Sequence, residues 1–272
     1  MVLGSLLPGT PVGAAPSEQS EAQRQATRLK DAARAVGAAG AAVEERRRRS
    51  TPTPTTAVDQ LRADLQVSHA EFAFREAIRD EQEAVYLLAG HPDLEGPVLG
   101  LLPRPDAVAL GEVSAGVRAI WRLSGTRDLG QVRPRHSHRF NGSEPVAVLL
   151  EDYRSAATHE GVDWSYLAAI NYIESDFGRV NGPSSAGAMG PMQFLPGTWR
   201  QYGGSGDIMS ARDSIQAAAV FLARNGAPGD YDRAVLRYNH DQDYVAAVRS
   251  YAAAIRDDPL WLTRFYYWST FG

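Results

Sequence analysis

The sequence of 272 residues contains no cysteine, only one lysine and no long hydrophobic run. The absence of cysteine excludes disulfide bonds, cysteine-ligated metals and a thiol nucleophile. Because no run of about 18 apolar residues occurs, we expect no transmembrane helix within this chain. The formal net charge is −4, and this balance gives no basic surface of the kind that binds nucleic acid. With 44% hydrophobic and 22% charged residues, the composition is that of a globular protein.

Residues 1–56 are expected to form a leader, a polar helix and a linker. The opening stretch MVLGSLLPGTPVGAAPS has an apolar run and a small-residue end that resemble a signal peptide, but it lacks basic residues at its start and two prolines interrupt the run. An export signal and a flexible leader are therefore both retained as interpretations. Residues 18–48 are rich in Ala, Arg and Glu and predict a helix. The prolines of the following STPTPTT predict an extended linker.

Residues 57–135 predict a helical extension without catalytic chemistry. Apolar residues recur at helical spacing as far as Gly90, which is expected to end the first helix, and a shorter helix is expected over 111–125. This extension should pack against the following domain or separate it from an anchor. His136 and His138 follow in a loop, and without a third nearby ligand we interpret them as part of a solvated basic loop rather than a metal site.

The sequence from about residue 145 to 256 predicts a domain made of helices. No segment shows the strict alternation of a half-buried strand, so the expected fold class is all-α. Helix N-caps are expected at three aspartates and helix ends at three glycines: Asp163, Asp213, Asp243, Gly161, Gly178 and Gly226.

Glu174 lies at the end of an apolar helical run, beside a loop that is poor in side chains. The buried stripe of that helix is marked by four residues: Leu167, Ile170, Ile173 and Phe177. Glu174 lies at the border of this stripe and in the last helical turn, so partial burial and the helix dipole should both raise its pKa. A carboxylic acid that stays protonated near neutral pH suits general acid catalysis. An exposed glutamate at a frayed helix end is the alternative, and the downstream sequence favours catalysis.

Four short motifs follow one another in the C-terminal half. They are ES at 174–175, GAMGPMQF continuing into LPGTW at 187–199, DSI at 213–215 and YN at 238–239. This ordered set resembles the lytic transglycosylase family with the soluble-transglycosylase (SLT), lysozyme-like domain. The resemblance covers about residues 148–256. It implies an all-α, lysozyme-like (SLT) catalytic domain that follows the helical N-terminal extension.

The resemblance also implies a substrate and a reaction. The substrate is the glycan strand of peptidoglycan, which is cleaved at the β-1,4 bond between N-acetylmuramic acid and N-acetylglucosamine. Glu174 would protonate the glycosidic oxygen while the 2-acetamido group assists, and Glu174 would then act as base on the 6-hydroxyl to form 1,6-anhydro-muramic acid. An intramolecular hydroxyl has a large effective concentration and can therefore outcompete water. No cofactor and no metal are implied.

Further roles follow from the same resemblance for the residues beside Glu174 and in the loop. Ser175 is expected to orient Glu174 or a sugar hydroxyl, or to act only as a local cap. Gln193 is expected to contact substrate. Met192 and Phe194 are expected to support the wall of the substrate groove, with ordinary core packing as the alternative. The small residues from 184 to 190 should let the backbone approach the sugar closely.

The YN motif and one departure from the family pattern complete the expected site. Tyr238 is expected to hydrogen-bond near Glu174 or the acetamido group, and Asn239 to shape the turn. Pro191 stands where many relatives have leucine. Because proline has no amide hydrogen, it cannot donate a backbone hydrogen bond to substrate at that position.

Two other functions are weighed against the transglycosylase. A hydrolytic muramidase on the same fold would use Glu174 as acid, with Asp207 or a positioned water for hydrolysis. Asp176 is about 200° round the helix from Glu174 and cannot face the same bond, and Asp213 is expected to be an N-cap. A non-catalytic peptidoglycan-binding scaffold module is disfavoured, because it has no need to keep Glu174, Gln193 and Tyr238 together.

The expected setting is outside the cytoplasm of a bacterium, in the cell envelope, the periplasm or the medium. Peptidoglycan glycan strands are the expected partner, nucleic acid is not, and a monomer is expected. The C-terminal tail, residues 257–272, is dense in aromatic side chains. These are expected to pack back over the helical domain and close its core, with stacking on sugar faces as the alternative.

Overall fold

The computed structural model describes residues 16–49, 57–125, 142–180 and 183–268. The leader, the STPTPTT linker, His136 and His138 and the last four residues of the aromatic tail lie outside the described residues. Within these ranges the chain is helical and contains no strand, which confirms the all-α expectation. The helices are α1 Pro16–Arg49, α2 Ala57–Gly90, α3 Pro92–Leu99, α4 Arg104–Leu123, α5 Val146–Glu160, α6 Trp164–Ser175, α7 Pro196–Tyr202, α8 Ala211–Asn225, α9 Tyr231–Tyr238, α10 Gln242–Asp257 and α11 Leu260–Tyr267.

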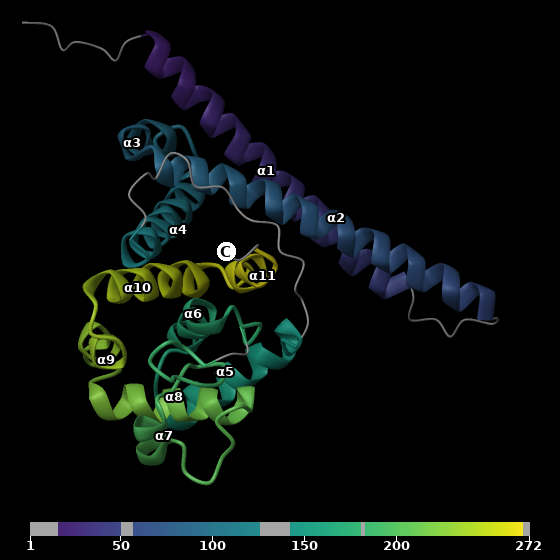
Figure 1. Ribbon diagram of the computed structural model, residues 1–272. Helices are drawn as coiled ribbons and strands as arrows, with labels where there is room; N and C mark the ends of the chain where they lie inside the picture. The colour runs from purple at the N-terminus through teal and green to yellow at the C-terminus, as the bar shows by residue number, and fades with distance from the viewer. Residues whose placement is uncertain (1–15, 50–56, 126–141, 181–182, 269–272) are drawn as a thin grey trace, which may run out of the picture.

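The helices α1 and α2 lie side by side as a long hairpin that projects beyond the rest of the molecule (Figure 1). Their apolar positions meet between them, with Leu29 and Ile78 fully buried. Ion pairs add to this contact at the surface, as between Arg47 and Glu71 at 2.8 Å. The expected helix over 18–48 and the helix end at Gly90 are both confirmed.

The segment between the hairpin and residue 125 is more helical than the sequence suggested. The helix α3 was not predicted, because its eight residues contain two prolines and a glycine and read as a loop. The helix α4 begins at Arg104 rather than near residue 111. Proline at one of the first two helical positions is compatible with a helix start, since the amide it lacks would have no partner there.

Helix caps in the C-terminal half were predicted correctly at one of the three aspartates. Asp163 caps α6 by accepting a hydrogen bond from the amide of Ser165 at 2.9 Å. The predictions for Asp213 and Asp243 are wrong. The caps are Ser210 for α8 and Asp241 for α10, two or three residues earlier, because in both cases an earlier polar residue already satisfies the free amides.

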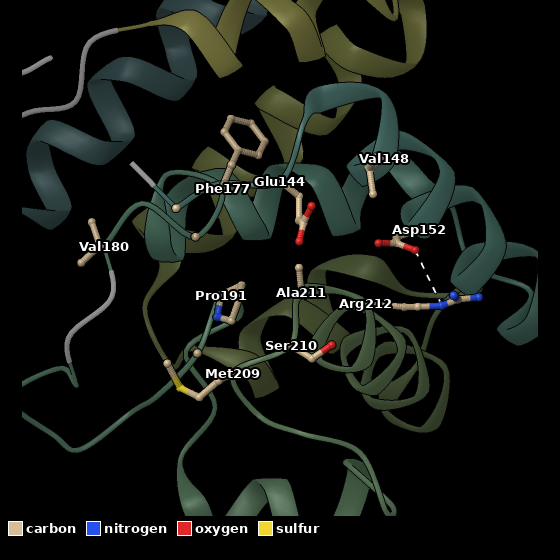
Figure 2. Close-up of a pocket in the computed structure, with 13 residues that line it drawn as sticks. Glu144, Val148, Asp152, Phe177, Val180, Pro191, Met209, Ser210, Ala211 and Arg212 are labelled. Carbon is tan, nitrogen blue, oxygen red and sulfur yellow. Dashed lines mark ion pairs between the residues drawn. The ribbon is translucent and has the colours of Figure 1, made fainter. Parts of the chain in front are cut away.

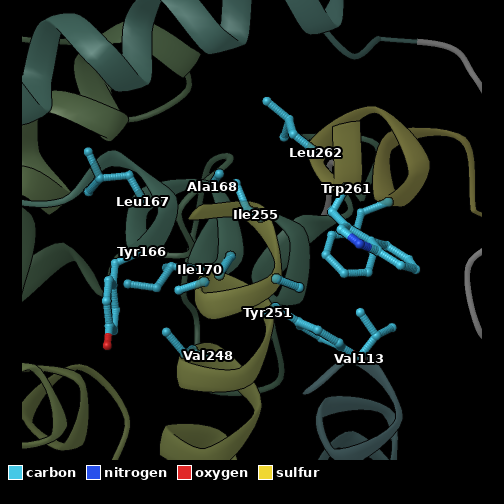
Figure 3. Close-up of a cluster of buried hydrophobic side chains, with 14 of the residues drawn as sticks. Val113, Tyr166, Leu167, Ala168, Ile170, Val248, Tyr251, Ile255, Trp261 and Leu262 are labelled. Carbon is cyan, nitrogen blue, oxygen red and sulfur yellow. The ribbon is translucent and has the colours of Figure 1, made fainter. Parts of the chain in front are cut away.

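A single hydrophobic core runs through the helical extension and the C-terminal helices. Figure 3 shows Val113 of α4 in the same cluster as Tyr251 of α10 and Trp261 of α11. The helices α4 and α10 approach closely at Gly116, where an added Cβ would lie 2.5 Å from the Tyr251 ring. Glycine is therefore required there for α4 to pack on α10.

The described part of the aromatic tail closes this core, as expected. Trp261, Phe265 and Trp268 are buried, and their rings contact one another at centroid distances of 5.1 to 6.1 Å. Phe271 lies outside the described residues. No helix in the described ranges is long and apolar enough to cross a membrane.

Candidate active site

Glu174 lies in the last turn of α6 and lines a cavity of about 290 Å³. The cavity is formed by α6, the segment after it, α10 and α4, and its lining residues are Ile120, Tyr172, Ile173, Glu174, Ser175, Asp176, Val180 and Tyr251. The carboxyl of Glu174 is therefore partly buried but still reaches open space, as a group that acts on a bound molecule must.

The environment of Glu174 favours its protonated form. Burial raises the pKa of this carboxyl from 4.5 to about 7, and a hydrogen bond from Tyr244 opposes the shift. The Tyr244 hydroxyl donates to Oε1 of Glu174 at 2.5 Å. A carboxyl with this pKa is protonated in a large fraction of molecules at neutral pH and can donate a proton.

Tyr244 is the residue at the site that the sequence analysis missed. It occupies the first turn of α10, where Asp241 caps its amide, and its side chain is fully buried. In the sequence it reads as an ordinary core aromatic of an amphipathic helix. Its only available signal is its place six residues after Tyr238, just beyond the YN motif.

The end of α6 is tightly constrained. The helix ends at Ser175 and not, as predicted, at Gly178, because Asp176 already adopts a left-handed conformation with φ of 50°. Phe177 and Gly178 continue with φ of 58° and 83°. Asp176 is buried and pairs with Arg179 at 3.1 Å, and burial raises its pKa to about 7 against the effect of Arg179. These contacts hold an unusual backbone directly after the candidate catalytic residue.

The loop of small residues is fastened to α6 through one carbonyl group. The carbonyl of Pro191 accepts hydrogen bonds from Nδ2 of Asn171 at 2.7 Å and from the hydroxyl of Ser175. The Ser175 oxygen also accepts from the amide of Gly178 at 2.8 Å. Proline at 191 thus supplies an acceptor to the protein, and its missing amide leaves no donor unpaired there.

Residues 189 to 194 form a tight turn. The amide of Met189 donates to the carbonyl of Phe194 at 2.9 Å, and the amide of Phe194 donates back at 3.0 Å. Gly190 and Gln193 have φ of 75° and 47°, and the side-chain amide of Gln193 donates to the carbonyl of Gly190 at 3.0 Å. Gln193 is half-buried, and in this structure its amide nitrogen is used within the turn.

The structure places three of the expected substrate-binding residues behind the surface. Ser175, Met192 and Phe194 are no more than 2% exposed. Ser175 holds the loop, and the Phe194 ring packs against Trp199 and Tyr238. For these three residues the geometry supports the alternative roles of local cap and core packing rather than direct contact with substrate.

Tyr238 and Asn239 end α9 close to the loop. The Tyr238 hydroxyl donates to the carbonyl of Met192 at 2.6 Å, so it fixes the turn and does not hydrogen-bond Glu174. Burial raises the pKa of the Tyr238 hydroxyl well above its usual value, and the charge of Glu174 adds a smaller effect in the same direction. Tyr238 is therefore close enough to Glu174 to interact with it electrostatically. Asn239 is the C-cap of α9, and its backbone is extended.

Asp207 and Asp213, the two loop carboxyls considered for a muramidase, form hydrogen bonds within their own loop. Asp207 is exposed, and its side chain accepts from the amide of Met209 at 2.9 Å. The Asp213 carboxylate accepts from the amide of Asp207 at 2.9 Å. Neither residue lines the Glu174 cavity. Asp176 does line it, so the expectation that this carboxyl cannot share the site is wrong: α6 ends at Ser175, and the left-handed Asp176 no longer follows helical geometry.

A second, larger cavity of about 500 Å³ lies next to this site (Figure 2). It shares Val180 with the Glu174 cavity and is bordered by Gly190 and Pro191 of the loop. Its charged groups are Glu144, Asp152 and Arg212, and the Arg212 guanidinium lies 3.8 Å from the Asp152 carboxylate. Among the described residues no group of three His, Cys, Asp or Glu side chains could hold a metal ion.

Comparison with known proteins identifies the domain that carries this site. Residues 152–258 match the model of the transglycosylase SLT domain. The chain is also 35% identical over 119 residues to "Membrane-bound lytic murein transglycosylase F" of Thiobacillus denitrificans, over 41% of this chain and 25% of that protein. No solved structure matches the chain.

Residues 152–258 are therefore a transglycosylase SLT domain, which confirms the resemblance drawn from the four motifs. The chain spans about a quarter of the length of the curated relative that it matches.

Proposed function

We propose that this protein is a peptidoglycan lytic transglycosylase with Glu174 as its single acid and base. The observation that carries the proposal is the partly buried Glu174, with a pKa of about 7, in a cavity of an SLT domain. The lytic murein transglycosylase that resembles this chain supports murein, the peptidoglycan of the bacterial wall, as the substrate.

In the proposed reaction Glu174 first donates its proton to the oxygen of the β-1,4 bond between N-acetylmuramic acid and N-acetylglucosamine. The bond between this oxygen and the anomeric carbon of N-acetylmuramic acid breaks. The carbonyl oxygen of the 2-acetamido group of the same N-acetylmuramic acid bonds to that carbon from the opposite face. Glu174, now a carboxylate, takes the proton of the 6-hydroxyl, whose oxygen displaces the acetamido oxygen and closes the 1,6-anhydro ring. Glu174 ends the cycle protonated, and no water is consumed.

The fixed surroundings of Glu174 support these two roles. Burial favours the neutral acid before bond cleavage, and the Tyr244 hydrogen bond stabilises the carboxylate that follows. A group that must be both acid and base works best with a pKa near the working pH. The turn at 189 to 194, fastened by Tyr238 and Ser175, is proposed to present Gln193 to the glycan.

We also propose the arrangement and the setting of the chain. Residues 1–56 are a leader, helix and linker, 57–135 a helical extension, 145–256 the catalytic domain and 257–272 an aromatic tail. The protein acts outside the cytoplasm of a bacterium, because its proposed substrate is there, and it acts as a monomer.

Mass spectrometry of the products released from purified sacculi tests this function. The wild type should release 1,6-anhydro-muropeptides, and Glu174→Gln should release none. Muropeptides with a reducing end would instead identify a muramidase. No release by the wild type, with binding to sacculi retained, would support the scaffold module.

A further inference from the structure

One wall of the Glu174 cavity comes from outside the SLT domain. Ile120 of α4 lines this cavity together with Glu174 and Tyr251, whereas the SLT match begins at residue 152. We propose that Ile120 is a specificity-determining residue that contacts the glycan bound beside Glu174. The helical extension is then part of the active site and not a spacer. This inference rests on the proposed function, since it concerns the substrate of the same cavity.

The position of Ile120 is fixed by the packing of α4 on α10. Gly116 lies four residues before Ile120 and so on the same face of α4, and an added Cβ there would lie 2.5 Å from the Tyr251 ring. Glycine thus lets the α4 backbone come to the wall of the cavity. Six residues after Gly116, Nε of Arg122 donates to the Asp243 carboxylate at 2.7 Å.

The same helix α10 positions both sides of the cavity. Asp243, the partner of Arg122, directly precedes Tyr244, whose hydroxyl binds Glu174. Tyr251, which contacts the Gly116 position, lines the cavity itself. The contacts of α10 with α4 and with Glu174 therefore fix the distance between Ile120 and the Glu174 carboxyl. A cavity wall that selects a substrate by its shape must be held in place in this way.

The chemistry of Ile120 suits one face of an N-acetylated sugar. Its side chain is only partly buried and stands with Ile173, Val180 and Tyr251 in a largely apolar lining around two carboxyls. A sugar ring presents C–H groups on its faces, and an acetamido group ends in a methyl. These groups can pack against Ile120 while hydroxyls remain available to polar partners.

The test compares three substitutions on α4 in a Glu174→Gln background, where strands bind without being cut. Ile120→Trp should fill the cavity and weaken binding of glycan strands from purified peptidoglycan by about tenfold or more. Val108→Trp introduces the same side chain on the same helix, at a position that is 48% exposed and outside the cavity, and should leave binding unchanged. Ile120→Val should bind like the parent. Thermal unfolding confirms that each variant is folded.

With Glu174 intact, Ile120→Trp should lower kcat/KM, whereas Val108→Trp and Ile120→Val should leave it unchanged. If Ile120→Trp is folded and binds like Val108→Trp, the inference is overturned. If Ile120→Trp does not fold, Ile120→Ala replaces it: weaker binding supports the contact, and unchanged binding overturns it.

The outcomes separate this inference from the proposed function. Absence of anhydro products from the wild type, together with loss of binding on Ile120→Trp, would contradict the reaction but support the contact. Anhydro products from the wild type, together with binding that Ile120→Trp does not change, would support the reaction but contradict the contact. A Glu174→Gln protein that binds no glycan strands at all overturns the contact directly.

Discussion

The hydroxyl of Tyr244 donates a hydrogen bond of 2.5 Å to Oε1 of Glu174 across 70 residues of sequence. This bond stabilises the carboxylate and so lowers the pKa of Glu174, against the larger effect of burial. In Tyr244→Phe the pKa should therefore rise above about 7. If activity requires the protonated acid, the loss of activity at high pH should move to higher pH, which a pH profile of kcat/KM measures.

Tyr238→Phe is the matched control for this prediction. Its hydroxyl donates to the carbonyl of Met192, so its loss should disturb the turn and lower activity without moving the pH at which activity falls. An equal shift in both variants, or none in Tyr244→Phe, would contradict the role given to Tyr244.

Glu174→Gln should also change how stability depends on pH. The carboxyl has a pKa of about 7 when folded and 4.5 as the reference for the unfolded chain, so between these values the folded state binds more protons. Raising the pH through this window therefore destabilises the wild type, by on the order of 3 kcal/mol. Glutamine does not titrate, so the variant should gain stability relative to the wild type between pH 5 and 8.

Denaturant unfolding of the two proteins at several pH values measures this difference. Glu81 and Asp176 also have pKa values raised to about 7 by burial, but they are present in both proteins and cancel in the comparison. A constant difference between the two proteins across the range would show that Glu174 is not perturbed in the folded state.

Gly190→Ala should disrupt the turn that carries Gln193. The position has φ of 75°, and an added Cβ would lie 1.9 Å from the carbonyl oxygen of Ile208, which is backbone and cannot rotate away. We expect a loss of more than about 3 kcal/mol in the free energy of unfolding, or local unfolding of the loop with loss of activity.

Gly187→Ala provides the comparison within the same loop. Its φ is 81°, but nothing lies within 4 Å of an added Cβ. It should cost only the strain of the left-handed conformation, about 1 kcal/mol. Similar unfolding free energies for the two variants would mean that the close approach of Gly190 to Ile208 is not maintained in solution.

Arg264→Met should destabilise the contact between the hairpin and the C-terminal helix. Arg264 of α11 lies 2.9 Å from the carboxylate of Glu81 on α2, and the two side chains are 10% and 2% exposed. Removing Arg264 leaves a buried carboxyl without its ion pair, which typically costs about 3–5 kcal/mol when the carboxyl is ionised. The loss of unfolding free energy should be smaller at pH 6 than at pH 8, because Glu81 is mostly protonated at pH 6.

Arg249→Met is the control for Arg264→Met. Its pair with Asp232 has a similar length, 2.7 Å, but both side chains are more than half exposed, so at most about 1 kcal/mol should be lost. Thermal unfolding of both variants measures the difference, and equal melting temperatures would contradict it.

Local sequence determined most of the helices and the place of the candidate catalytic residue. Apolar positions at helical spacing fixed α2, α5 and α6, because burying one face of a helix needs only that spacing. Glu174 at the border of such a face is partly buried for the same reason. The short helices α3 and α7 were missed, because their prolines and glycines are also typical of loops.

Tertiary structure decided which groups surround Glu174. Ser210 and Asp241 cap their helices in place of Asp213 and Asp243, and only the folded loop shows that Asp213 is used by the amide of Asp207. Tyr244 reaches Glu174, and Ile120 enters the wall, through the packing of α10 on α6 and of α4 on α10. The hydrogen bonds between distant segments, and the cavity lining that these segments form together, follow from how whole helices pack. No local pattern of residues specifies that packing.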